Sequence, residues 1–166
     1  MLLNEEQVKS ILPHRKPFLF IDSVEEVILP SGVKDKKDLS TRDLVGTKVV
    51  AHFEVKEDLE ILKGHFPGNP ILPGVVLIEL MAQASAFVSM PLGGIDMEKM
   101  DVETLLVSVG SSRFRKPVVP GMKLLIHATM VKNRGTIAGY TSEVFCDGEK
   151  ISEAEFMAKL EIKEKE

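Results

Sequence analysis

A histidine, His65, and a glutamate, Glu79, lie on one segment that passes from glycines and prolines into an apolar stretch. His65 stands in "GHFPGNP", and an imidazole can act as a base near neutral pH. Glu79 stands in "ILPGVVLIELMAQASAF", where burial would raise the pKa of its carboxyl group and favour the protonated form. A protonated carboxyl group can donate a proton, so the two residues could act as base and acid.

Each residue alone has a simpler interpretation. Buried acids serve structure more often than catalysis, and a lone histidine in a tight loop is more often a hydrogen-bonded surface residue. A third feature adds weight, because the amides of Gly74 and Val75 would open a helix and lack intrahelical partners. They could stabilise a carbonyl oxygen that gains negative charge, or they could simply bind water. Together, a base, an acid and such donors suit a β-elimination from a hydroxyacyl thioester.

The elements that carry these residues can be predicted from patterning. Asn4 is expected to cap a first helix, Gln7 to reach back to it, and Pro13 to end it. Strands are expected over 18–29 and 47–55, separated by a charged loop over 30–46. The long apolar helix should begin at Gly74 or Val75 and run to Met90.

The second half of the chain predicts an antiparallel sheet. Four strand-like runs cover 103–110, 122–132, 136–145 and 150–162, after a connection over 92–101. Turn signals around Gly135 and Gly148 separate the last three runs. Residue propensities alone do not exclude a helix over 153–162. A helix that is apolar nearly all round must be covered on nearly all sides, so we expect a curved sheet around it within one domain, 1–166.

Composition limits the function classes. The 166 residues are 44% hydrophobic and 28% charged, with a net charge of −4, which predicts a globular protein that binds no nucleic acid. The single cysteine, Cys146, cannot form an internal disulfide and fits a reducing compartment. The first ten residues are acidic where a signal peptide would be basic, and the apolar run is too short for a membrane span. We therefore expect a cytoplasmic protein that does not insert into a membrane.

Three motifs closely resemble the 3-hydroxyacyl-acyl-carrier-protein dehydratases of the FabZ type: "LPHRKPFLFID", "GHFPGNPILPGVVLIELMAQAS" and "SRFRKPVVPG". The resemblance spans nearly the whole chain in the right order. It implies an α+β hot-dog fold, in which a curved antiparallel sheet wraps around one long apolar helix. It also implies dimers, often assembled as trimers of dimers. The implied activity is that of a hydro-lyase in fatty-acid biosynthesis. Such an enzyme converts (3R)-3-hydroxyacyl thioesters on acyl carrier protein to trans-2-enoyl thioesters.

The resemblance also assigns roles by motif position. His65 would be the catalytic histidine and Glu79 the catalytic acid, meeting across a dimer interface. The amide of Gly74 would polarise the thioester carbonyl, the backbone carbonyl of Ile71 would orient the histidine ring, and Gln83 would support Glu79. Sister enzymes of the FabA type, which also isomerise the double bond, carry aspartate at the acid position. The glutamate found here favours dehydration without isomerisation. No metal or redox cofactor is implied, since the substrate is carried on phosphopantetheine.

Acyl carrier protein is acidic, so a basic docking site is expected. The cluster Arg113, Arg115 and Lys116 could serve this role or could be solvated charges at a strand end. For Lys132 and Arg134 we expect only solvated charges. The spacing of the remaining histidines does not suggest metal ligation. We expect His14 and Arg15 to be structural and Cys146 to pack in a strand.

Two departures from the family pattern concern chain length and gating. The 30–46 segment is longer than usual, and Ile61-Leu62 replaces an aromatic pair that gates the substrate tunnel. Two alternatives remain. A hot-dog thioesterase would release a free thiol, and a non-catalytic acyl-binding subunit would have no need for both His65 and Glu79.

Overall fold

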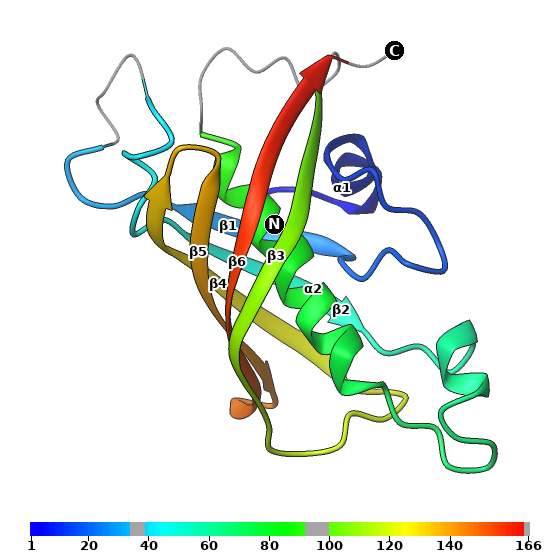
Figure 1. Cartoon of the computed structure of the whole chain (residues 1–166). Coiled ribbons are helices and arrows are strands. Elements are labelled where there is room, and N and C mark those ends of the chain that lie inside the picture. The colour runs from blue at the N-terminus through cyan, green and yellow to red at the C-terminus, as the bar shows by residue number, and fades with distance from the viewer. Residues whose placement is uncertain (34–38, 92–99, 165–166) are drawn as a thin grey trace.

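The computed structural model describes residues 1–33, 39–91 and 100–164, with the backbone alone described at 100–104 and 160–164. It contains one six-stranded sheet in which all neighbouring strands are antiparallel, in the order β1-β2-β4-β5-β6-β3. The strands are β1 (Ser23–Ile28), β2 (Lys48–Glu54), β3 (Met100–Phe114), β4 (Lys123–Arg134), β5 (Ile137–Cys146) and β6 (Glu149–Glu164). β1 and β3 are therefore the edge strands (Figure 1).

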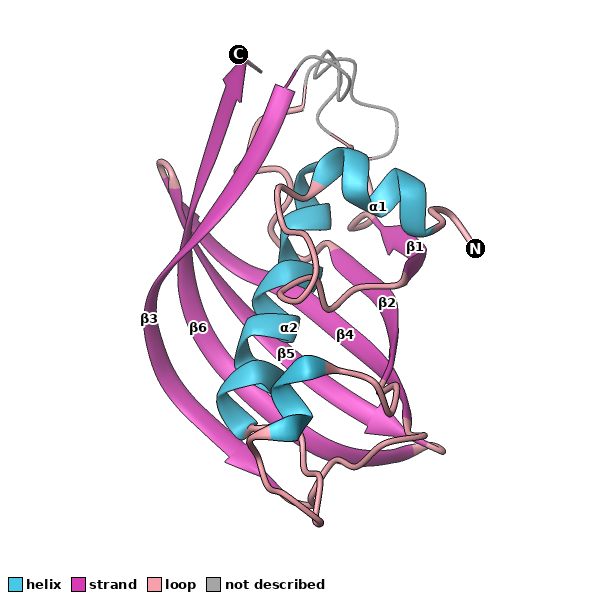
Figure 2. Ribbon diagram, turned by 90° about the vertical axis from the view of Figure 1, so that its right-hand side faces the viewer, coloured by secondary structure: helices cyan, strands magenta, loops and turns pink. Residues whose placement is uncertain are grey.

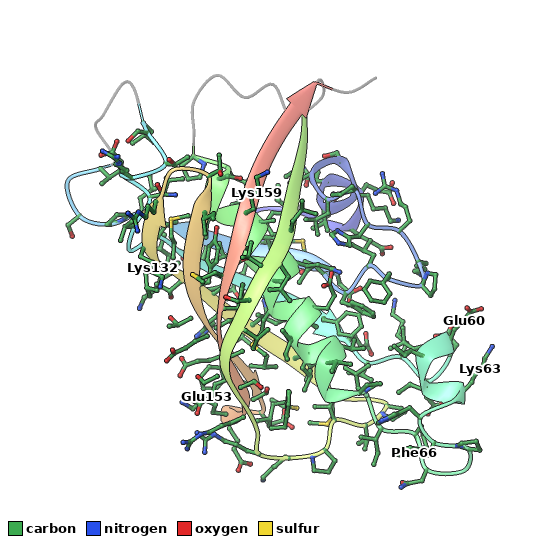
Figure 3. The ribbon with its side chains drawn as sticks, viewed as in Figure 1. Glu60, Lys63, Phe66, Lys132, Glu153 and Lys159 are labelled. Carbon is green, nitrogen blue, oxygen red and sulfur yellow. The ribbon has the colours of Figure 1, made fainter. Side chains whose placement is uncertain are left out.

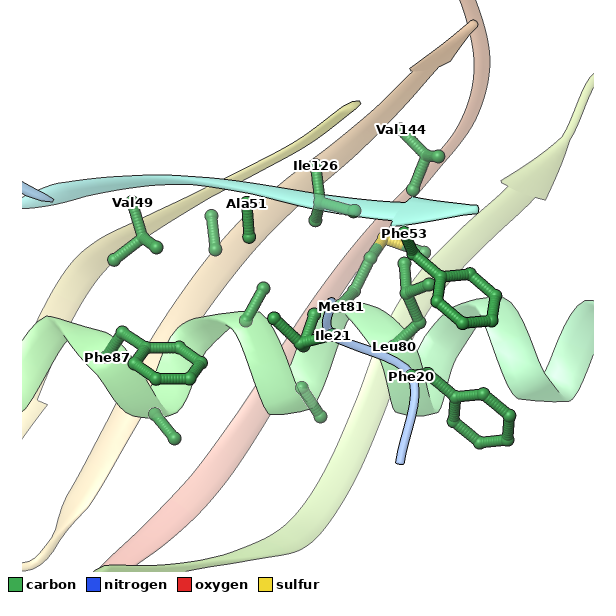
Figure 4. Packing of buried hydrophobic residues seen from close by; sticks show 14 of the residues in the cluster. Phe20, Ile21, Val49, Ala51, Phe53, Leu80, Met81, Phe87, Ile126 and Val144 are labelled. Carbon is green, nitrogen blue, oxygen red and sulfur yellow. The ribbon is translucent and has the colours of Figure 1, made fainter. Parts of the chain in front are cut away.

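The sheet curves around one helix, α2 (Gly74–Ala86), which continues as the short 3₁₀ helix η2 (Phe87–Ser89) (Figure 2). Leu80, Met81 and Phe87 are fully buried, and they pack against the residues of β2 and β4 that point inward (Figure 4). The inward-facing side chains of β2 alternate with more exposed ones, as expected for a strand with one buried face. This arrangement confirms the predicted α+β hot-dog fold.

Two shorter helices complete the described elements. Helix α1 (Glu5–Ile11) has the predicted capping box, since Asn4 accepts from the Gln7 amide and the Gln7 side chain accepts from the Asn4 amide. Its buried side chains lie toward the core near β1. The 3₁₀ helix η1 (Glu60–Lys63) leads directly into the segment of His65, so residues 61 and 62 belong to this helix.

The structure corrects two predicted boundaries. The strand predicted over 18–29 covers only Ser23–Ile28, because the Phe20 amide and the Phe18 carbonyl bond to the side chain of Gln83 instead of to a neighbouring strand. The α-helix predicted to reach Met90 ends at Ala86, and the last turn tightens into η2.

A further boundary differs in β3, which begins at Met100, within the connection predicted over 92–101, and runs to Phe114, beyond the predicted 103–110. The other predictions for the sheet agree with the structure. Residues 153–162 are strand and not helix, with Phe156 and Ala158 buried as the alternating pattern indicates. Gly135 and Gly148 have the positive φ angles that the hairpin turns require. Residues 34–38 of the long loop and 92–99 of the predicted connection lie outside the described part. Within the described ranges, no helix has both the length and the apolar character needed to cross a membrane.

Candidate active site

His65 is held by the segment that follows η1. Its ring Nδ1 lies 2.8 Å from the carbonyl oxygen of Ile71, and its own carbonyl accepts from the Ile71 amide at 2.8 Å. Because a carbonyl only accepts, Nδ1 must carry the proton and donate, which leaves Nε2 of the neutral ring as the acceptor. The ring also stacks on Phe66, whose position after η1 is visible in Figure 3. The contact predicted between Ile71 and His65 is therefore present, and it leaves Nε2 able to take a proton.

The backbone between these two residues forms a tight turn. Phe66 and Asn69 exchange hydrogen bonds between their main-chain groups, at 3.0 and 2.9 Å. Gly68 within this turn has a φ of 76°, a conformation that glycine adopts without steric cost. The local sequence "GHFPGNP" thus fixes the loop that brings Ile71 back to His65.

A cavity of about 260 Å³ lies beside the histidine and the start of α2. Its lining consists of residues from three segments of the chain: His65, Ile71, Leu72, Gly74, Leu77, Phe114, Arg115, Lys116, Pro117 and Val118. The structure therefore brings His65 and Gly74 to one cavity. Arg115 and Lys116 lie in the same lining, while Arg113 does not.

Gly74 is the first residue of α2, and within the described chain its amide and that of Val75 donate to no protein acceptor. The ring of Phe114 lies so close to Gly74 that a Cβ atom there would come within 3.1 Å of it. Only glycine allows this approach without displacing the ring. Val75 is 72% exposed, so its side chain adds nothing to the core of the subunit.

Glu79 has different surroundings. Its Oε1 accepts from Gln83 Nε2 at 2.8 Å and lies 3.2 Å from Nε2 of His14. The hydrogen bond from His14 is the largest influence on the carboxyl group and lowers its pKa; burial acts in the opposite direction, and Gln83 lowers the pKa further. The sequence-based expectation of a raised pKa for Glu79 is thus wrong for the subunit. Burial is present as expected, but the two donors outweigh it.

Gln83 is buried and uses both ends of its amide. Its Oε1 accepts from the Phe20 amide at 2.9 Å, and its Nε2 donates to the Phe18 carbonyl at 2.9 Å as well as to Glu79. The predicted contact between Gln83 and Glu79 is present. The structure adds that Gln83 is itself fixed by the main chain of residues 18–20, which replaces strand pairing there.

His14 is the residue that sequence reasoning missed. Its Nδ1 is buried with no partner among the described residues, and its Nε2 faces Glu79. The proton of the neutral ring therefore belongs on Nε2, where it can be donated to the carboxylate. The motif "LPHRKPF" contained this residue, but nothing in the spacing of His14 and Glu79 indicates that they meet.

Within one chain, the predicted site falls into two groups. His65, Ile71 and Gly74 share the cavity at the start of α2, whereas Glu79, Gln83 and His14 contact one another. Glu79 is not part of the lining of the His65 cavity. Within one subunit, the predicted base and the predicted acid therefore have separate surroundings.

The three cations predicted for docking differ from one another. Arg115 contacts Glu153 at 2.5 Å, and Lys116 contacts Glu149 at 2.5 Å. Arg113 lines a separate hollow on the sheet together with several carboxylates: Glu143, Glu153 and Glu155. Of the three, only Arg115 and Lys116 therefore combine a basic side chain with a position at the His65 cavity.

Two of the remaining histidines and the single cysteine lie in other surroundings. His52 contacts Glu25 at 2.8 Å on the surface, and the ring of His127 lies against Phe145. Burial and the neighbouring Asp147 raise the pKa of the Cys146 thiol, which disfavours the nucleophilic thiolate. Across the described ranges, no three residues of the types His, Cys, Asp and Glu are grouped so that they could hold a metal ion.

With this geometry established, comparisons place the chain in a family. Residues 12–155 match the FabA-like domain, and the chain belongs to this family. Among its relatives is the 3-hydroxyacyl-[acyl-carrier-protein] dehydratase FabZ of Anaeromyxobacter sp. (strain Fw109-5). The two are 36% identical over 165 residues, covering 99% of this chain and 94% of that protein. FabZ of Thiobacillus denitrificans is 35% identical and covers 95% of this chain and 97% of the relative.

Solved structures agree on the fold. The dehydratase heterocomplex ApeI:P from Xenorhabdus doucetiae contains a chain that superposes with a TM-score of 0.65 at 20% identity, covering 93% of this chain and 90% of that one. A thioesterase superfamily member from Thermus thermophilus superposes with a TM-score of 0.56 at 17% identity, covering 70% and 82%. At these identities the likeness supports the hot-dog architecture and nothing about the substrate.

Proposed function

We propose that this protein is a hydro-lyase that dehydrates (3R)-3-hydroxyacyl-[acyl-carrier-protein] to trans-2-enoyl-[acyl-carrier-protein] in fatty-acid biosynthesis. The observation that carries the proposal is the arrangement at one cavity of two groups: a histidine whose Nδ1 is held by a carbonyl, and the amide of Gly74, which donates to no acceptor in the described part of the chain. FabZ-type relatives that match nearly the full length of the chain support the same reaction. We assign the protein to the cytoplasm, in keeping with its composition and single cysteine.

In the proposed reaction, Nε2 of His65 removes the proton from the α-carbon of the hydroxyacyl thioester. The electron pair of that C–H bond forms the double bond to the β-carbon, whose bond to the hydroxyl oxygen breaks. Glu79 delivers a proton to this oxygen, which leaves as water. The amide of Gly74 donates to the thioester oxygen as negative charge develops on it. The proton on His65 then returns to Glu79, so the enzyme is restored without a redox cofactor or metal.

A site shared between two subunits would unite the two groups of residues. Edge strand β3 pairs only with β6 in the described sheet, and it exposes large apolar side chains: Leu105, Leu106, Val107 and Val109. A long apolar edge of this kind is a favourable surface for pairing with a second copy. We propose a homodimer in which His65 of one subunit faces Glu79 of the other, with dimers assembling further into a trimer of dimers.

The lowered pKa of Glu79 affects how this pair would work. His65 and Glu79 together need to hold one proton, and the reactive form is the one with that proton on Glu79. A carboxyl group with a lowered pKa carries the proton in a smaller fraction of molecules but releases it more readily. Activity should follow a bell-shaped pH profile whose limbs belong to the pair rather than to either residue alone.

The natural substrate would arrive on the phosphopantetheine arm of acyl carrier protein. Arg115 and Lys116 line the cavity, which supports a role for them in attracting an acidic carrier. Arg113, which lies outside this lining, is the weaker of the three proposed docking residues.

Two measurements test the proposal. Formation of the enoyl thioester from 3-hydroxyacyl-carrier-protein is followed by its ultraviolet absorbance, while release of free thiol is followed with a disulfide reagent. The proposal expects enoyl product without thiol. Thiol release in its place would identify a thioesterase, and tight acyl binding without either product would identify a binding subunit.

The shared site is tested by mixing two inactive variants, His65→Ala and Glu79→Gln, under conditions that allow subunit exchange. In each mixed dimer, one site would regain both functional groups and the other would lose both. Random exchange should then restore about a quarter of the wild-type activity, because half of the dimers are mixed and each has one intact site. Absence of any recovery, with exchange verified by differently tagged subunits, would overturn the shared site.

A further inference from the structure

The two cations at the His65 cavity are already paired with acids of the same chain. We infer that Glu153 is the internal counter-ion of Arg115 and Glu149 that of Lys116, and that the acidic surface of the carrier protein displaces both glutamates when it docks. The inference rests on the proposed function and adds a mechanism for partner recognition. It assigns a role to two glutamates that take no part in the chemistry.

The two cations directly follow the end of β3, and their counter-ions lie on the neighbouring strand β6. The main chain of Arg115 is fixed to β6, because its amide donates to the Ile151 carbonyl at 2.8 Å. Glu149 and Glu153 stand two residues to either side of Ile151, and Figure 3 shows Glu153 toward the end of β6 that adjoins the hairpin from β5. The backbone therefore holds both cations at the cavity, while their side chains are positioned by exposed ion pairs.

These ion pairs are suited to exchange. The Lys116 and Glu149 side chains are 52% and 59% exposed, and those of Arg115 and Glu153 are 41% and 28% exposed. Ion pairs that are open to solvent in this way contribute little to stability, because water screens the attraction and ordering the side chains costs entropy. An incoming carboxylate can therefore replace an internal one at small cost, while the long-range attraction between the two proteins still favours the encounter.

The displaced glutamates would not be left as unpaired buried charges. Glu153 also contacts Lys150 at 2.7 Å, and Lys150 in turn contacts Glu143 at 2.8 Å. Glu153 therefore keeps a cation when Arg115 turns to a partner. Glu149 is the more exposed of the two acids and can be hydrated by solvent. Because each displaced glutamate either keeps a cation or is hydrated, docking should not incur the large free-energy penalty of an uncompensated buried charge.

The occupant that we assign is a protein surface with several carboxylates, and not the phosphate of the phosphopantetheine arm. Two cations with two separate counter-ions match a partner that presents more than one acid at the cavity mouth. In the unbound state, the glutamates reduce the net positive charge at the cavity and would weaken its attraction for unrelated anions. They would thereby favour partners that can replace both contacts at once.

The experiment compares Glu149→Gln and Glu153→Gln with Glu25→Gln as a matched control. Glu25→Gln removes the same charge from another exposed pair, the one with His52, and neither residue of that pair lines the cavity. Steady-state kinetics are measured with a 3-hydroxyacyl-carrier-protein, the corresponding phosphopantetheine thioester and the N-acetylcysteamine thioester. We expect the KM for the carrier-protein substrate to fall roughly 2- to 5-fold in each test variant and to depend more steeply on salt. The KM for the two small thioesters should be unchanged, and the control should resemble the wild type.

Each other outcome argues against the inference. An unchanged or higher KM in both test variants would mean that the glutamates do not compete with the carrier. An equal fall in the control would assign the effect to net charge alone. A fall with the phosphopantetheine thioester would identify its phosphate as the displacing group. Failure of the proposed function is distinguishable, because the wild type would then turn over none of the three substrates.

Discussion

The two groups proposed to carry the reaction are held in opposite ways. His65 lies on a loop, and among the described residues its ring has one hydrogen bond, to a carbonyl six positions along the chain. Glu79 lies in the middle of α2 and receives donors from two side chains, one of which is fixed in turn by residues 18–20. The base is thus oriented by local sequence, whereas the acid is oriented by tertiary contacts.

This difference has a physical basis in what each group needs. A histidine base needs one nitrogen protonated and held so that the other stays free, and a single carbonyl achieves this. A carboxyl group has two equivalent oxygens, so the position of its proton is set only when one oxygen is occupied. His14 and Gln83 both donate to Oε1 of Glu79. This leaves Oε2 as the oxygen that can hold the proton to be delivered.

The largest expected effect comes from removing the base. His65→Ala should reduce kcat roughly 10²–10⁴-fold, as expected for the loss of one acid–base group. The overall fold should remain, because the ring makes one hydrogen bond to the main chain and a stacking contact with Phe66. Turnover of a hydroxyacyl thioester and far-ultraviolet circular dichroism measure the two properties. Activity within a few-fold of the wild type would show that His65 is not the base.

Removing the group that holds the acid should affect stability as well as activity. In Gln83→Leu, the Phe20 amide loses its partner in a buried environment, and the Phe18 carbonyl loses its partner in a partly buried one. The free energy of unfolding should fall by roughly 1–3 kcal/mol, the cost of leaving buried polar groups unsatisfied. Denaturant unfolding measures this change. A variant as stable as the wild type would mean that residues 18–20 find other partners easily.

His14 should act on the pH profile. His14→Leu removes the donor that most lowers the pKa of Glu79, so that pKa should rise and the acidic limb of the profile should move to higher pH. We expect kcat at the optimum to fall about 10-fold as the carboxyl group loses its orientation. His14→Gln retains a donor and should lie closer to the wild type in both respects. Equal pH profiles for the two variants would show that His14 contributes packing and no hydrogen bond of consequence to Glu79.

The smallest effect concerns acid stability. Because the folded pKa of Glu79 is lowered, its contribution to stability is present above the ordinary carboxyl pKa and is lost as pH falls through the folded value. Glu79→Gln should therefore flatten the pH dependence of unfolding below about pH 5, by less than about 1 kcal/mol after allowance for solvent screening. Parallel pH dependences of the two proteins would show that the contact with His14 is too weak to matter for folding.

The pattern of residues in the sequence was sufficient to predict most of the helices and strands, and part of the candidate site. Alternation and turn residues predicted the later strands, and the capping signal of Asn4 predicted α1. The contact of Gln83 with Glu79 was also predictable, because the helical repeat places residues four positions apart on one face. The contact of His65 with Ile71 was expected from the family resemblance alone.

What only the tertiary structure decided is the state of the acid. His14 and residues 18–20 lie more than sixty positions from the residues of α2 that they contact, and no local pattern reports that they meet Glu79 and Gln83. From burial alone the pKa of Glu79 should rise, and the sequence could indicate burial. The direction was reversed by two donors, because a pKa depends on the particular partners of each protonation state and those partners are set by how the chain folds back on itself.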